Sequence, residues 1–261
     1  MGIASREEIL LNPIRLLRDL GLSILFPATC AICGSHLGWR SENPVCATCW
    51  EEVRLIQQPI CPICGQPFSD EAGTDVSKKT YCNSCQECSP AFIQARSIFF
   101  YEGAIRHLIH EFKYQGNIRI GKFLARSMVS CWDSSEADIS SVDCIVPVPI
   151  GRKKLRQREF NQSLILARQI GKKLKVPVYP FGLERVKEVA PQMKLSRLER
   201  MRNIQNSFRV RDGRKVCGRK VLLVDDVFTT GATARECSRV LRYSGAEEVR
   251  VLTLARSVRT R

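Results

Sequence analysis

The chain has 261 residues, 13 cysteines and a formal net charge of +15. This length suits one large domain, alone or with a small domain attached. A hydrophobic share of 44% with a charged share of 26% excludes the collagen-like and disordered classes. The longest apolar stretches, such as residues 22–28, are far shorter than the ~20 residues that a membrane-spanning helix needs.

Residues 1–28 form the first predicted segment. The apolar positions of Glu7–Phe26 follow a helical period, which charged residues interrupt. No small-residue cleavage site precedes Cys30, so the segment is not typical of an export signal. We interpret it as an amphipathic packing helix, with a membrane anchor as the alternative, and we expect a cytoplasmic protein. In that reducing compartment, clustered cysteines usually bind metal instead of forming disulfides.

The charge is uneven along the chain. Residues 1–90 contain seven Lys/Arg and ten Asp/Glu, a net charge of −3, whereas residues 147–220 contain 21 Lys/Arg and five Asp/Glu, a net charge of +16. Everything outside that second segment therefore sums to about −1. Such a concentration favours the binding of a polyanion. A solubilising surface is the alternative.

Residues 29–90 form a cysteine-rich segment with four CxxC pairs, spaced by 12 residues between the first two pairs and by 17 between the last two. Two such pairs complete a tetrahedral zinc site of four thiolates, and a site without an open position is structural. We predict one or two structural Zn2+ ions with sequential pairing, and crossed pairing is the alternative. A redox dithiol would suit one CxxC better than four. The predicted ligands are Cys30, Cys33, Cys46, Cys49, Cys61, Cys64, Cys82 and Cys85.

Residues 220–233, KVLLVDDVFTTGAT, carry the most informative motif. Val221–Val224 is a continuous apolar run, as expected of a strand buried on both faces of a parallel sheet. Two acids and a Thr/Gly-rich turn follow, and then the helical pattern Ala234–Tyr243. A strand, turn and helix in this order place backbone N–H groups and hydroxyls at a helix N-terminus, which suits a phosphate. Threonines that merely cap the helix are the alternative.

Residues 91–261 alternate between strand and helix patterns. This alternation predicts an α/β fold with a parallel sheet flanked by helices, and the ligand site at the carboxyl ends of the strands. The other expected strands are Ala95–Tyr101 at an edge, Asp143–Pro149, a short Val176–Tyr179 and Glu248–Ala255; the other expected helices are Gly103–Tyr114, Ile118–Cys131 and Asn161–Leu174.

The motifs together resemble a known family. LVDDVFTTGAT is similar to the phosphoribosyl-pyrophosphate (PRPP) motif of type I phosphoribosyltransferases. With the CxxC pairs, FKYQG at Phe112–Gly116, DCIVPVP, Arg152–Ser163, Gln192 and Arg197–Asn203, the whole chain resembles the ComF (competence protein F) family. The resemblance implies a small N-terminal double zinc ribbon, a type I phosphoribosyltransferase-like domain, binding of PRPP with Mg2+, and a part in the uptake of transforming DNA.

The resemblance also assigns residues. Asp225 and Asp226 would contact the ribose, as the catalytic pair, and Gln192–Asn203 would correspond to a mobile loop over the site. The full PRPP-binding set would be Asp225, Asp226, Val227, Thr229, Thr230, Gly231, Ala232 and Thr233. The cations expected to face pyrophosphate or DNA are Lys113, Arg152, Lys153, Lys154, Arg156, Arg158, Arg197 and Arg202.

One residue departs from the family pattern. Glu159 stands where family members usually have glycine, and we expect its carboxylate either to pair with Arg156 or Arg158 or to hinder an anion. Two functions follow as hypotheses. The first is a phosphoribosyltransferase of unknown acceptor. The second is a non-catalytic protein that binds single-stranded DNA through the zinc ribbon and a basic groove, with Tyr114, Phe160 and Phe208 as base-stacking or core residues. Other DNA-uptake proteins are possible partners.

Overall fold

The computed structural model describes residues 28–38, 41, 43–68, 81–132, 141–187 and 197–258. The predicted helix Glu7–Phe26 and residue Gln192 lie outside these ranges. The chain forms two compact units, residues 1–52 and residues 53–261. The first two CxxC pairs therefore belong to the first unit, and the last two belong to the second.

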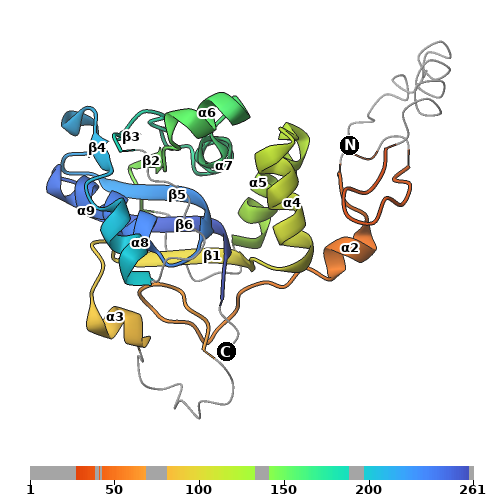
Figure 1. The fold of residues 1–261 in the computed structure, drawn as a ribbon, viewed down its shortest axis with the longest axis horizontal. Coiled ribbons are helices and arrows are strands. Elements are labelled where there is room, and N and C mark those ends of the chain that lie inside the picture. Colours follow the sequence, from red (N-terminus) through yellow and green to blue (C-terminus); the bar gives the residue numbers. More distant parts are fainter. Residues whose placement is uncertain are drawn as a thin grey trace, which may run out of the picture. The chain divides into compact units, whose positions relative to one another are not determined.

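The second unit is built on a parallel sheet of four strands, in agreement with the predicted fold class (Figure 1). The order is β1–β6–β5–β2, which places β1 at an edge, as expected. The strands are β1 (Gln94–Phe100), β2 (Cys144–Pro147), β5 (Lys220–Phe228) and β6 (Glu248–Arg256). The apolar run of β5 is completely buried at all four positions, because neighbouring strands and both faces of the sheet cover it.

The short expected strand at residues 176–179 is reduced to one bridge, between Val178 and Ile145 of β2. Pro177 accepts a hydrogen bond from the Ile145 N–H but has no N–H of its own, so the pairing cannot extend through it. A separate antiparallel pair joins β3 (Leu183–Arg185) to β4 (Phe208–Val210).

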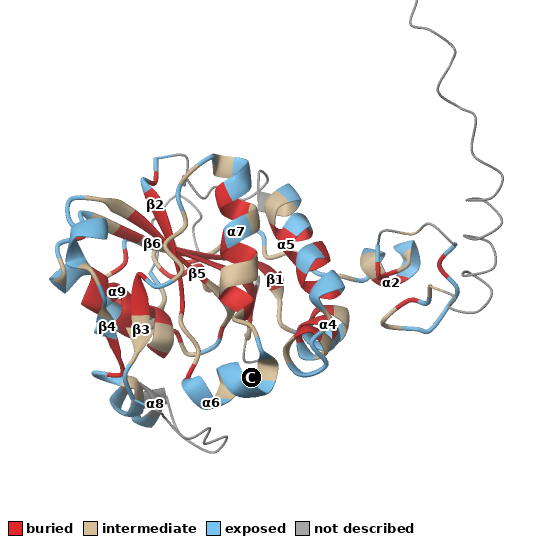
Figure 2. Cartoon of the chain, turned by 90° about the horizontal axis from the view of Figure 1, so that it is seen from above, coloured by how far each residue is buried: buried red, intermediate tan, exposed pale blue. Residues whose placement is uncertain are grey.

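Helices flank the sheet on both sides: Figure 2 shows α9 on one side and α5 with α7 on the other. None of the helices in the described ranges is both long enough and apolar enough to cross a bilayer. The helices are α2 (Ala47–Glu51), α3 (Asn83–Glu87), α4 (Gly103–Tyr114), α5 (Ile118–Trp132), α6 (Arg152–Arg158), α7 (Gln162–Leu174), α8 (Arg197–Ile204) and α9 (Ala232–Tyr243), and a 3-10 turn spans Gly213–Lys215.

β5 continues further than its apolar run predicts. Its pairing with β6 extends from Asp225, opposite Thr253, to Phe228, opposite Arg256. The two acids are therefore strand residues and not the start of a loop. Because successive strand side chains point to opposite faces, neighbouring acids in β5 meet different partners.

Candidate functional site

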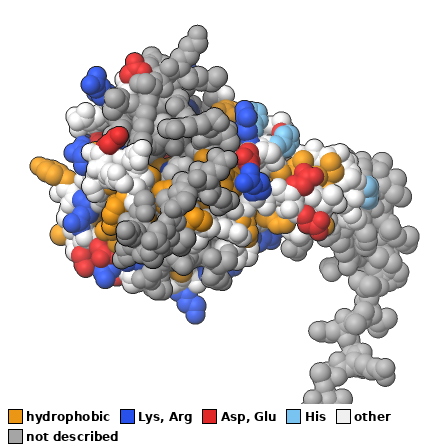
Figure 3. All heavy atoms as spheres, turned by 90° about the horizontal axis from the view of Figure 1, so that it is seen from below, with side chains coloured by type: hydrophobic (Ala, Val, Ile, Leu, Met, Phe, Trp, Pro, Cys, Tyr) orange, Lys and Arg blue, Asp and Glu red, His pale blue; other side chains and the backbone are white. Residues whose placement is uncertain are grey.

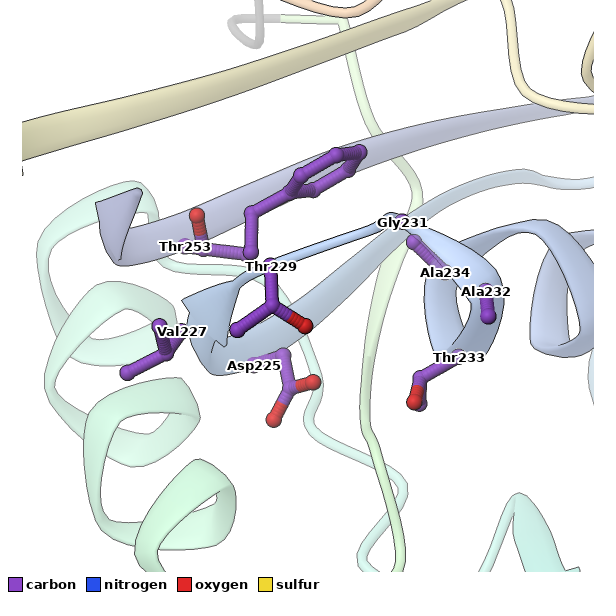
Figure 4. A pocket seen from close by; sticks show the side chains of 9 residues that line it. Asp225, Val227, Thr229, Gly231, Ala232, Thr233, Ala234 and Thr253 are labelled. Atoms are coloured by element: carbon purple, nitrogen blue, oxygen red, sulfur yellow. The ribbon is translucent and has the colours of Figure 1, made fainter. Parts of the chain in front are cut away.

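The connection from β5 to α9 forms a small pocket at the carboxyl end of the sheet (Figure 4). Gly231 is the N-cap of α9 and has a left-handed backbone, φ 76°, which glycine adopts without steric cost. In Figure 4 the side chains of Asp225, Thr229 and Thr233 lie around one space beside the start of α9. The pocket is lined by Asp225, Val227, Phe228, Thr229, Gly231, Ala232, Thr233, Ala234 and Thr253.

The backbone amides of this turn are available to a ligand. The Ala232 N–H donates a long hydrogen bond, 3.4 Å, to the Thr230 hydroxyl oxygen. Within the described residues, the N–H groups of Thr229, Thr230, Gly231 and Thr233 donate no hydrogen bond. Unpaired amides at the start of a 12-residue helix form an electropositive site, which suits an anion such as phosphate.

Asp225 is held at the edge of this pocket. Its Oδ1 accepts hydrogen bonds from the Ser163 hydroxyl of α7 and from the Asp226 N–H, both 2.9 Å long. Burial, and then the charge of Asp226, raise the pKa of Asp225 to about 7. A carboxyl with this pKa can change its protonation state near neutral pH.

Asp226 meets a different partner. Its Oδ2 lies 2.7 Å from Nζ of Lys113, at the end of α4, and both side chains are largely buried. Burial alone would lower the pKa of Lys113, but the charge of Asp226 outweighs it and the pKa is raised. Lys113 is therefore a charged partner of the acidic pair.

The basic segment after β2 forms a short helix, α6. Lys154 is partly buried, and its pKa is lowered by burial and then by the charges of Arg158 and Arg185, with Lys113 also contributing. These three cations therefore lie close enough to Lys154 to repel its charge, and a bound anion would relieve that repulsion. On the face shown in Figure 3, by contrast, Lys and Arg side chains are dispersed among acidic, hydrophobic and neutral ones.

The remaining predicted cations whose side chains the structure describes are exposed. Arg152, Lys153 and Arg156 lie on the solvent side of α6. Arg202 is an exposed residue of α8, and Arg197 begins the same helix, so the second half of the expected mobile loop is helical.

Among the described residues, Glu159 makes neither of the two expected ion pairs, and its effect on an anion stays a prediction. It is exposed and follows α6 with a left-handed backbone, φ 64°, while its N–H donates to the Leu155 carbonyl. Within the described residues, it forms no ion pair with Arg156 or Arg158. A left-handed position explains why glycine suits it, because the side chain of any other residue is strained there.

The three aromatic residues predicted to stack on bases or to lie in the core differ in their exposure and contacts. Phe208 is 4% exposed and is a core residue. Phe160 stacks on the buried Phe112 at 5.3 Å between ring centroids. Tyr114 is 57% exposed and lies against the Arg158 guanidinium, 4.8 Å from the ring centroid.

Sequence reasoning did not single out two residues of this site. Ser163 lies in a quoted motif but received no role, because a serine at a helix start is usually a cap. Arg185 lies in the short strand β3, and its approach to Lys154 depends on tertiary packing that no local signal predicts.

The eight CxxC cysteines form two tetrads, paired sequentially: Cys30, Cys33, Cys46 and Cys49 in the first, and Cys61, Cys64, Cys82 and Cys85 in the second. Within each tetrad, all sulfurs lie within 4.8 Å of one another. Gly34 and Gly65 follow the second cysteines of two knuckles and have left-handed backbones, φ 72° and 69°, which glycine adopts without steric cost.

The geometry of the tetrads fits zinc. A Zn–S bond of 2.3 Å implies sulfurs about 3.8 Å apart in a tetrahedron. The Cys33–Cys46 and Cys64–Cys82 sulfurs are 3.8 Å and 3.5 Å apart. The Cys46 N–H also donates to the Cys30 sulfur, as the backbone around a thiolate site typically does.

In the second tetrad, Cys61 and Cys64 shift each other's pKa. A hydrogen bond from Cys64 lowers the pKa of Cys61 to about 4. The pKa of Cys64 is raised, mainly by this hydrogen bond and secondly by burial. Four crowded sulfurs cannot all be anionic without a metal ion between them.

The comparisons agree with both parts of the chain. The double zinc ribbon domain family matches residues 21–89, and the phosphoribosyl transferase domain family matches residues 161–261. The chain is 30% identical over 220 residues to competence protein F of Haemophilus influenzae, which covers 83% of this chain and 92% of that protein. It is 29% identical over 234 residues to the DNA utilization protein YhgH of Salmonella typhimurium, covering 89% and 98%.

Among solved structures, the adenine phosphoribosyltransferase of Leishmania tarentolae aligns with 56% of this chain and 74% of its own, at 15% identity and a TM-score of 0.34. The match to competence protein F extends over nearly all of that relative. The chain therefore belongs to the competence protein F family, with a double zinc ribbon and a phosphoribosyltransferase-like domain.

Proposed function

We propose that this protein binds PRPP together with Mg2+ and serves DNA uptake or utilisation, as the names of its relatives indicate for them. The observation that carries the proposal is a set of unpaired backbone amides beside the carboxyl groups of Asp225 and Asp226. The amides are those of Thr229, Thr230, Gly231 and Thr233. The amides and hydroxyls would hold the 5′-phosphate, and the carboxylates would accept hydrogen bonds from the ribose hydroxyls.

The cations of α4 and α6 would face the pyrophosphate. In phosphoribosyl transfer, the bond from ribose C1 to the pyrophosphate oxygen breaks, its electron pair leaves with pyrophosphate, and C1 bonds to an acceptor. Lys154 and Arg158 would stabilise the charge that builds on the leaving group. Carboxylate oxygens are donors that Mg2+ prefers, and the ion, carried in with PRPP, would neutralise part of the pyrophosphate charge.

Calorimetry with PRPP and Mg2+ tests the proposal. The wild type should release or absorb heat at a saturable site, and Asp225→Asn combined with Asp226→Asn should abolish it. Asp212→Asn, which removes a carboxylate paired with Arg214, is the matched control and should bind as the wild type does. No heat from the wild type at millimolar PRPP would contradict the proposal.

A second function is favoured by one observation. The cations Arg152 and Arg156 are exposed on α6, and the exposed Tyr114 ring lies beside the same helix through Arg158. Cations next to an accessible aromatic ring are typical of single-stranded DNA binding. We propose that this surface contacts single-stranded DNA.

Salt dependence tests the second function. The logarithm of the affinity for an oligonucleotide should fall linearly with the logarithm of the salt concentration, with a slope near −0.7 for each phosphate contacted. Arg152→Glu with Arg156→Glu should reduce that slope, whereas Lys172→Glu on the exposed side of α7 should not. An equal slope in the first variant would remove α6 from the DNA surface.

A further inference from the structure

We call the turn at residues 229–233, which would hold phosphate, the phosphate loop. The second cysteine tetrad is part of the same core as this loop. Cys61, Cys64 and Cys85 are buried in one hydrophobic cluster with Phe228 and Ala234. The knuckle after Cys64 also packs tightly on β1: a Cβ added to Gly65 would lie 2.7 Å from the Ala95 carbonyl oxygen. The tetrad therefore cannot move independently of the sheet.

Arg256, the last residue of β6, connects the tetrad to the loop. It is 5% exposed, and its guanidinium donates to the Cys64 carbonyl at 2.8 Å and contacts the Cys64 sulfur at 3.8 Å. It also donates to the Gln66 side chain at 2.8 Å. A tetrahedral site of four thiolates and one Zn2+ carries a net charge of −2, so a buried guanidinium against it is electrostatically favoured.

The other face of the Arg256 guanidinium covers the Phe228 ring, 4.4 Å from the ring centroid. Phe228 in turn supports the turn that begins α9, since a Cβ added to Gly231 would lie 2.6 Å from the ring. A continuous series of contacts therefore runs from the Cys64 sulfur through Arg256 and Phe228 to the amides of the phosphate loop.

A second connection reaches the same turn. Arg235, in the first turn of α9, donates to the Cys88 carbonyl at 2.7 Å and to the Ser84 carbonyl at 3.2 Å. These carbonyls belong to α3 and its C-cap, and α3 carries the ligand Cys85. The start of α9 is thus attached to the tetrad at two points.

We propose that metal binding at the second tetrad positions the phosphate loop, with Arg256 as the positioning residue, and that loss of this metal weakens phosphate binding. The inference rests on the proposed PRPP site for its binding readout. A structural zinc ribbon would stabilise only its own fold. The inference goes further, because it assigns the second tetrad a role in the anion site. The first tetrad lies in the other compact unit and serves as the comparison.

The experiment compares Cys85→Ser with Cys49→Ser in the full chain. Native mass spectrometry should count one zinc fewer in each variant than in the wild type. Hydrogen exchange at the amides of residues 229–233 should become at least tenfold faster in Cys85→Ser and stay at the wild-type rate in Cys49→Ser. Equal exchange in the two variants would overturn the inference, whether or not the wild type binds PRPP.

A milder variant covers the case in which Cys85→Ser does not fold. Arg256→Lys keeps the charge, but one ammonium cannot both bond to Cys64 and Gln66 and lie flat on Phe228. It should retain the wild-type zinc count, exchange the loop amides faster and bind PRPP at least tenfold more weakly. Arg242→Lys, at the far end of α9, should leave all three unchanged.

The outcomes separate the two proposals. A wild type that binds no PRPP, with loop exchange still dependent on Cys85 and Arg256, overturns the proposed function alone. If the wild type binds PRPP, and Arg256→Lys binds it equally well with unchanged exchange of the loop amides, only the positioning role is overturned.

Discussion

Lys113 and Asp226 form a largely buried ion pair, 2.7 Å between Nζ and Oδ2, although 113 positions separate them in the chain. The side chains are 17% and 14% exposed, so solvent screens the pair only partly. Since α4 ends where β5 reaches the carboxyl edge of the sheet, this pair ties the helix to the acidic dyad of the candidate site.

Replacing Lys113 by Met should destabilise the protein by about 2 kcal/mol, because it leaves the Asp226 charge buried without a partner. Adding Asp226→Asn should recover most of that loss. Urea unfolding measures both effects. Arg214→Met, which breaks an exposed pair with Asp212, is the control and should cost about 0.5 kcal/mol or less. A double variant no more stable than Lys113→Met would show that the pair is not coupled.

Stability should depend on pH through Asp225. Its folded pKa, about 7, lies above its ordinary value of 3.8, so the native state binds more protons than the unfolded state between these values. The free energy of unfolding should therefore fall as pH rises from about 4 to 7 and level off above 7.

Asp225→Asn should remove this part of the pH dependence and raise stability at pH 8 by at least about 1 kcal/mol, since Asn can still accept from Ser163. Thermal unfolding across the pH range measures the effect. Parallel pH curves for the two proteins would contradict the raised pKa.

Glu159→Gly should stabilise the protein by about 1 kcal/mol, because it relieves a left-handed backbone in a residue with a side chain. Glu159→Ala is the matched variant: it removes the carboxylate but keeps the strain, and should give no such gain. If both variants were equally stabilised, the carboxylate and not the backbone would be responsible. Chemical denaturation distinguishes the two cases.

Gly231→Ala should destabilise the protein by about 2–3 kcal/mol for two reasons. The new methyl group would collide with the Phe228 ring, and alanine would be strained at the positive φ of this position. Gly218→Ala provides the comparison, because that residue also has a positive φ, 65°, but its added Cβ meets nothing within 4 Å. The difference between the two losses measures the contact with Phe228. Equal losses would show that Phe228 does not restrict the turn.

Local signals in the sequence were sufficient for much of the fold. The continuous run Val221–Val224 indicated a fully buried strand, and its burial confirms this, because such a run has no polar face to expose. The spacing of the four CxxC knuckles likewise favoured sequential pairing, and the two tetrads confirm it. The end of β5 was predicted wrongly, because the apolar run stops at Val224. The strand continues through Asp225 to Phe228, since β6 supplies its hydrogen-bonded partner.

The partners of the site residues could not be predicted from the sequence. A sequence pattern specifies how a residue relates to its neighbours three or four positions away, whereas Arg256 meets Cys64 at a separation of 192 residues. The same holds for Ser163 with Asp225 and Lys113 with Asp226. By itself the sequence determined the strand, the turn and the cysteine knuckles, since each is encoded within a short stretch. Only the tertiary structure decided which cation faces which acid and which tetrad supports the turn, because packing of distant segments sets those distances.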